Sequence, residues 1–207
     1  MAWERYYLTL RRLPRRLKKP VPFVVEDLRR YKINSVLDLG CGAGRPSVHL
    51  AKNSFDVVGV DISKSALGLA NTWARKEKLK NIALVRGTMT NLPFCNDHFD
   101  AVVSVSVVHH AVKKDILKTI TEVHRVLRKN GIFLANLASV KDPRYGVGEK
   151  VENNTFKTLE GFEEKRFEEL HHYFSKREVS TLLSRFSRAE IKLLEEKPNY
   201  WKVTAMK

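Results

Sequence analysis

Two kinds of apolar pattern alternate along the chain as far as residue 137. Longer segments with apolar positions at helical spacing lie at residues 46–52, 63–78 and 113–129. Short, mostly apolar runs, typical of strands buried on both faces, lie at residues 36–39, 57–60, 82–85, 101–108 and 132–137. Because strand and helix alternate, the pattern predicts an α/β fold with a doubly wound, mostly parallel sheet.

Both ends of the chain depart from this alternation. Residues 3–32 predict two helical pieces, broken around Pro14 and Pro20–Pro22. We expect an αL C-cap at Gly131, where the longest predicted helix has just ended. Residues 139–174 are polar and show no clear period, so we expect a lid-like insertion there.

The last part of the chain returns to regular structure. A helix is predicted at 175–186, because Ser175 and Glu178 have the spacing of a capping box. Two strands at 189–194 and 200–205 flank a turn and predict an antiparallel hairpin. We therefore expect one domain over residues 1–207, with a basic helical segment at 1–32.

The first predicted strand ends in three glycines at alternate positions, Gly40, Gly42 and Gly44. Glycine has no Cβ, so its backbone can approach a ligand closely. The next strand ends on Asp61, and an acid at that place can accept hydrogen bonds from both hydroxyls of a ribose. Together these features predict a nucleoside-binding crevice at the carboxyl edge of the sheet.

The glycine spacing decides which nucleoside is expected. Dinucleotide-binding folds carry G-x-G-x-x-G, whereas this chain has G-x-G-x-G followed by Arg45. With these motifs, residues 36–137 resemble the class I S-adenosylmethionine (SAM) dependent methyltransferases, in the group often labelled type 11 or type 25. The resemblance implies a three-layer Rossmann-like methyltransferase fold, with a seven-stranded sheet and a C-terminal antiparallel hairpin. It also implies SAM as cofactor and S-adenosylhomocysteine as product.

The resemblance assigns cofactor contacts to particular residues. The backbone of Gly40 and Cys41 would face the methionine part of SAM, and Ile62 would pack on the adenine. Thr88 stands where the family usually has an acid, so we expect the adenine contact from the backbone of Thr88 and Met89. Asp38 either binds the ligand ammonium indirectly or has a structural role. The other cofactor-binding positions implied are Gly42, Gly44, Asp61, Gly87 and, beside the sulfonium, Ser104.

Candidate catalytic residues follow the fourth predicted strand. His109 and His110 lie where the transferred methyl group must emerge, and a neutral imidazole there can act as a general base. The alternative for both is a structural hydrogen bond. Candidate acceptor contacts are Tyr7, Arg144, Tyr145 and His172.

The charge leaves two kinds of acceptor open. The chain carries a net charge of +15, and residues 11–19 hold six basic residues and no acid. Such a surface attracts nucleic acid, or it helps a small anion to approach. Aromatic residues are not interleaved with this cluster as a base-stacking surface requires. We therefore expect methyl transfer to an O or N atom of a small molecule; the alternatives are an RNA methyltransferase and a non-catalytic module that binds RNA or a partner.

The remaining sequence signals are negative. Cys41 and Cys95 have no metal-ligand or disulfide spacing, and the adjacent His171 and His172 point to opposite sides of an extended chain. We therefore predict no metal. No apolar run approaches the ~20 residues of a membrane span, and no signal-peptide pattern is apparent, so a cytoplasmic location is expected.

Overall fold

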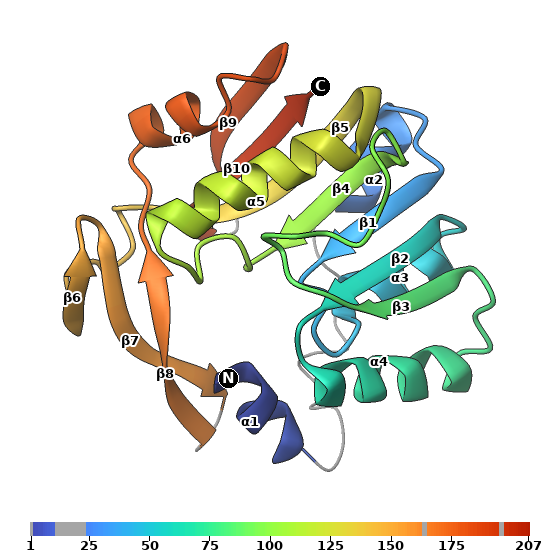
Figure 1. The fold of residues 1–207 in the computed structure, drawn as a ribbon, viewed down its shortest axis with the longest axis horizontal. Helices are drawn as coiled ribbons and strands as arrows, with labels where there is room; N and C mark the ends of the chain where they lie inside the picture. Colours follow the sequence, from blue (N-terminus) through green and yellow to red (C-terminus); the bar gives the residue numbers. More distant parts are fainter. Residues whose placement is uncertain (1, 11–23, 163–164, 195–196) are drawn as a thin grey trace.

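Seven strands form the main sheet in the order β3-β2-β1-β4-β5-β10-β9 (Figure 1). The computed structural model describes residues 2–10, 24–162, 165–194 and 197–207. The first five strands run parallel, and β10 lies antiparallel between β5 and β9. This confirms the predicted sheet and its closing hairpin. The strands are β1 (Ser35–Leu39), β2 (Asp56–Asp61), β3 (Ile82–Arg86), β4 (Phe99–Val105), β5 (Leu127–Ala138), β9 (Arg188–Leu194) and β10 (Lys197–Met206).

Helices cover both faces of this sheet, and the alternation of side chains along each strand explains why. In β1, Val36 packs in one apolar cluster, while Leu37 and Leu39 pack in the cluster on the other face. One cluster includes α5 and α6, and the other includes α2 and α3. The helices are α2 (Val24–Arg30), α3 (Arg45–Lys52), α4 (Lys64–Lys76), α5 (Lys113–Val126) and α6 (Lys176–Leu182).

Two helices begin at the predicted caps. The Ser63 hydroxyl accepts a hydrogen bond from the Ala66 N–H at the start of α4 (3.0 Å). The Ser175 hydroxyl accepts from the Glu178 N–H at the start of α6 (3.2 Å). The carboxylate of Glu178, however, lies 3.1 Å from His172 Nε2. Glu178 therefore joins α6 to the strand before it.

Several predicted boundaries differ from the structure, among them the carboxyl ends of β4 and α5. β4 ends at Val105 because Ser106 has a φ of 57° and breaks the extended conformation. α5 ends at Val126, because Leu127 is already extended and pairs with Phe99 in the sheet. Gly131 is consequently a strand residue and no αL cap. A Cβ there would lie 2.8 Å from the carbonyl oxygen of Arg128.

The insertion contains a second sheet, which the sequence did not predict. Its antiparallel strands are β6 (Glu149–Glu152), β7 (Thr155–Phe162) and β8 (Lys165–His172), in the order β6-β7-β8. The alternation is weak because apolar side chains such as Leu159 are exposed on this sheet. The first helix, α1 (Ala2–Leu8), contacts both β8 and α4 and so joins the second sheet to the first (Figure 1).

Two further expectations concern the N-terminal segment and membrane spans. Of the two helical pieces predicted before residue 32, α1 and α2 are present, and the basic cluster at 11–19 lies outside the described residues. No helix in the described ranges is both long enough and apolar enough to span a bilayer.

We predict opposite effects of alanine at two glycines. Gly44 has a φ of 88°, and a Cβ there would lie 2.9 Å from the Ala70 Cβ, so Gly44→Ala should destabilise the fold by about 1–3 kcal/mol. Gly68 is helical with no atom near its Cβ position, so Gly68→Ala should stabilise it by about 0.4–1 kcal/mol. Equilibrium urea unfolding measures both. Equal effects of the two substitutions would contradict the packing of α3 against α4.

Candidate cofactor and acceptor pocket

A pocket of about 770 Å³ opens where the carboxyl ends of β1, β2, β3 and β4 meet. Ligands of doubly wound sheets bind at this edge, beside the point where the strand order reverses. Here that point lies between β1 and β4. The far side of the pocket is formed by α1, by the second sheet and by Tyr200 of β10.

The glycine loop after β1 forms one wall of the pocket. Gly40 and Gly42 have φ values of 67° and 53°, a region that glycine enters without steric cost. A Cβ on Gly42 would lie 2.6 Å from the Tyr7 hydroxyl, so the glycine lets α1 come down onto the loop. Burial raises the pKa of Tyr7, which therefore stays neutral. Cys41 also lines this wall.

Asp61 lies beside the loop at the end of β2. Its carboxylate accepts hydrogen bonds from the Gly42 N–H and the Ser63 N–H, both at 2.8 Å. Burial raises the pKa of this carboxyl, against the lowering effect of these N–H groups. Each carboxylate oxygen can accept a further hydrogen bond, as a ribose requires. The next residue, Ile62, lines the pocket with 40% of its surface exposed, which suits a flat apolar ligand group.

The loop after β3 completes this half of the pocket. Gly87, Thr88 and Met89 all line it. The Thr88 hydroxyl lies 3.1 Å from the Thr90 hydroxyl, so it is engaged within its own loop. The three loops together offer an acid, backbone groups and an apolar face, which fits the sugar, amino-acid and adenine parts of SAM.

Three expected cofactor residues do not line the pocket. Asp38 is buried behind the loop, where it accepts a hydrogen bond from the Ser47 hydroxyl (2.5 Å), and burial raises its pKa to about 7. Gly44 packs against Ala70, and Ser104 is buried within β4. These residues support the loops from behind.

Two expected acceptor contacts also lie away from the pocket. The Tyr145 ring packs on Phe156 and Tyr173, and its hydroxyl bonds Asn154. His172 Nδ1 lies 2.7 Å from the Thr155 hydroxyl, and its Nε2 contacts Glu178. Because side chains alternate along β8, His171 rather than His172 reaches the pocket.

The other expected residues meet at the acceptor end. Tyr7, His109, His110 and Arg144 all line the pocket. Burial keeps the pKa of His109 well below its usual value, so this imidazole is neutral. Arg144 forms an ion pair with Asp142 and contacts the Tyr200 hydroxyl. Several further residues line the pocket that no sequence pattern had pointed to: Arg45, Arg166, Glu169, His171 and Tyr200.

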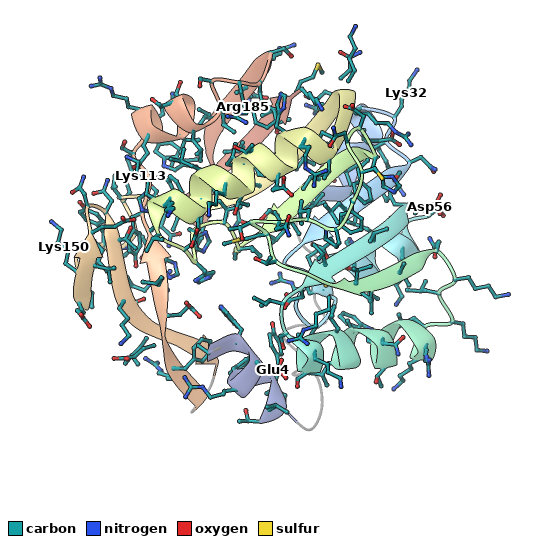
Figure 2. All side chains as sticks on the ribbon, in the orientation of Figure 1. Glu4, Lys32, Asp56, Lys113, Lys150 and Arg185 are labelled. Carbon is teal, nitrogen blue, oxygen red and sulfur yellow. The ribbon has the colours of Figure 1, made fainter. Side chains whose placement is uncertain are left out.

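A carboxylate on α1 holds this helix across the pocket. Glu4 accepts hydrogen bonds from the hydroxyls of Ser63 (2.6 Å) and Ser65 (2.7 Å) at the start of α4 (Figure 2). These bonds lower the pKa of Glu4, which is therefore ionised. Trp3, one residue earlier, lines the pocket with its ring 5.4 Å from that of His110.

The reversed strand order, the glycine loop and the acid after β2 define a nucleoside-binding α/β protein of Rossmann-like type. Residues 36–131 match the family model described as a methyltransferase domain. Residues 36–131 thus carry a methyltransferase domain of the class I, SAM-dependent type, as the resemblance implied.

Individual proteins agree with the family match. An uncharacterized methyltransferase of Synechocystis sp. is 39% identical over 109 residues, which cover 53% of this chain and 49% of that protein. A fatty-acid O-methyltransferase of Mycolicibacterium smegmatis is 34% identical over 116 residues, covering 55% and 39%. This chain thus spans less than half the length of these two relatives. The solved structure of a SAM-dependent methyltransferase from Methanosarcina mazei shares the fold, with a TM-score of 0.75, 23% identity and coverage of 91% and 99%.

Asp38 should make stability depend on pH. Its pKa is about 7 in the folded chain and about 3.9 in an unfolded one. The stabilisation from the neutral acid is therefore complete below about pH 4 and is lost as the pH rises through about 7. We expect the urea midpoint of the chain to fall between about pH 5 and pH 8, and that of Asp38→Asn to fall less. Parallel pH profiles for the two proteins would contradict this assignment.

Proposed function

We propose that this chain binds SAM in the pocket and transfers its methyl group to an O or N atom of a small molecule. The observation that carries the proposal is the arrangement of one cavity. Asp61 and the glycine loop form one end, and His109 and His110 form the other. Cofactor and acceptor would thus meet inside a single cavity.

The cofactor end of the pocket has to bind SAM and to orient its methyl group. When bound, SAM supplies a methyl group already activated by the sulfonium. Asp61 would accept the ribose hydroxyls, and the backbone of Gly40 and Cys41 would hold the amino-acid part. Ile62 would pack on the adenine. Holding the acceptor atom in line with the methyl carbon and sulfur supplies much of the acceleration, since well-oriented pairs reach effective molarities of order 10⁵ M or more.

The acceptor end needs to exclude water and activate the acceptor atom. Trp3 and Tyr7 on α1, with Glu169 and His171 on β8, cover this end. We assign the activation of the acceptor to His109 and His110. Removal of bulk water strengthens the interactions of these groups with the acceptor.

The enclosure favours a small acceptor over RNA. Among the described residues, α1 and β8 contact each other and both line the pocket, which narrows the access of a polymer to this end. The fatty-acid O-methyltransferase among the relatives acts on a small molecule by its name. An RNA acceptor is the competing outcome of the second experiment below.

The first experiment tests cofactor binding. Isothermal titration of the chain with SAM and with S-adenosylhomocysteine should show micromolar binding. Asp61→Ala should weaken it at least about tenfold, since one hydrogen bond to a charged group contributes about 1.5–3 kcal/mol. The control is Asp56→Ala, at the opposite, exposed end of β2, which should leave binding unchanged. Absence of binding by the unaltered chain would overturn the proposal.

The second experiment tests the acceptor. The chain is incubated with methyl-labelled SAM and either the low-molecular-mass fraction or the purified RNA of a cell extract. We expect label in the small molecules, because the pocket is covered on its acceptor side, and its loss in Asp61→Ala. Label in RNA alone would contradict the small-molecule assignment while leaving the methyl transfer intact.

A further inference from the structure

Three imidazole rings meet at the acceptor end of the pocket. The ring centres of His109, His110 and His171 lie 4.5, 4.6 and 4.7 Å apart, close to an equilateral triangle. One nitrogen atom of each ring lies within 4.8 Å of the other two. His109 and His171 are buried, and His110 is half-buried. They come from two segments about sixty residues apart, the loop after β4 and the end of β8.

Hydrogen bonds on both sides of His171 hold the triangle together. The His172 N–H donates to the carbonyl oxygen of His109 at 2.7 Å. His110 Nδ1 lies 3.1 Å from the carbonyl oxygen of Leu170. A carbonyl acceptor places the proton of a neutral imidazole on Nδ1, so the lone pair of His110 is on Nε2. Metal-binding histidines typically have such a partner on their other nitrogen.

The chemistry of the cluster favours a metal. A metal ion binds the lone pair of a ring nitrogen, and all three rings bring one nitrogen to the same place. Neither ring nitrogen of this fully buried side chain has a hydrogen-bond partner among the described residues. A buried polar atom without a partner costs about 1–3 kcal/mol, which a bound ion would offset. Three imidazoles around one zinc ion have ring centres about 5 Å apart, given Zn–N distances of about 2.0–2.1 Å.

The charged groups around the cluster leave room for a cation. The guanidinium of Arg144, which faces His109, is ion-paired with the carboxylate of Asp142 at 3.1 Å. Glu169 lines the same pocket and adds a negative charge. The charge of Arg144 is thus paired, while Glu169 and the cation Arg166 both line the pocket.

We propose that His109, His110 and His171 bind a divalent transition metal ion, Zn²⁺ in the first place, at the acceptor end of the pocket. Three protein ligands leave a fourth coordination position, as in catalytic zinc sites. That position would take the heteroatom of the acceptor. This role of the ion rests on the proposed function, but the binding of the ion does not. An X–H group at that position would give its proton to the carboxylate of Glu169, which lines the same pocket. The bond from X to the methyl carbon then forms as the carbon–sulfur bond breaks, and its electron pair stays on sulfur.

Metal binding to the chain, without a polyhistidine tag, tests the proposal. Equilibrium dialysis against Zn²⁺ with elemental analysis should give one ion per chain, and Co²⁺ should give the visible absorption of a tetrahedral site. His171→Ala and His110→Ala should each weaken Zn²⁺ binding by at least about 10–100-fold, the loss already seen when an outer partner of a ligand is removed. His49→Ala, on α3 and away from the pocket, is the matched control and should bind normally.

Circular dichroism shows that each variant is folded, and binding of S-adenosylhomocysteine, measured on the same samples, separates the two proposals. Absence of Zn²⁺ and Co²⁺ binding in a chain that binds S-adenosylhomocysteine would overturn the metal site alone. Equal Zn²⁺ affinity in all the histidine variants would also overturn it. Zn²⁺ binding that depends on His110 and His171, in a chain that does not bind S-adenosylhomocysteine, would support the metal site and overturn the proposed function.

Discussion

The carboxylate of Asp61 joins the parts of the cofactor site. It accepts hydrogen bonds from the N–H of Gly42 in the loop after β1 and from the N–H of Ser63 at the start of α4. Ser63 in turn caps α4 and donates to Glu4 of α1. One acid thus connects two strands, one helix and the cover of the pocket, so the position of each depends on the others.

The loop can take part in this connection only because it lacks side chains. Gly42 lies where a Cβ would meet the Tyr7 hydroxyl, and Gly40 lies where a Cβ would meet the Val107 side chain. The first contact sets how closely α1 approaches. The second sets how closely the loop before His109 and His110 approaches. Both ends of the pocket are therefore shaped by the same short turn.

The acceptor end depends on a different kind of contact. The end of β8 meets the loop after β4 through the bond from His172 to His109 and the contact of His110 with Leu170. These contacts join segments about sixty residues apart. No local sequence pattern predicts such a pair of segments, since neither has the spacing of a known metal-ligand motif.

The prediction from sequence was good where a local rule acts. Continuous apolar runs gave the central strands, and Ser63 and Ser175 marked two helix starts, because buried strands and N-caps each depend on residues close in the chain. It failed at the end of α5 and at Gly131, where pairing of Leu127 with Phe99 across the sheet overrides the helical pattern. It also failed for the second sheet, whose strands expose apolar residues such as Leu159.

The sequence by itself therefore determined the family and the mostly parallel sheet, because the apolar strands, the glycine spacing and the acid after β2 are local features of the chain. Only the tertiary structure decided which side chains close the pocket. It brought His171 rather than His172 to the pocket, since strand alternation selects one side and only the docking of β8 shows which side is inward. It also placed Asp38 behind the loop, because its neighbour Leu39 lines the pocket and successive strand residues point to opposite faces.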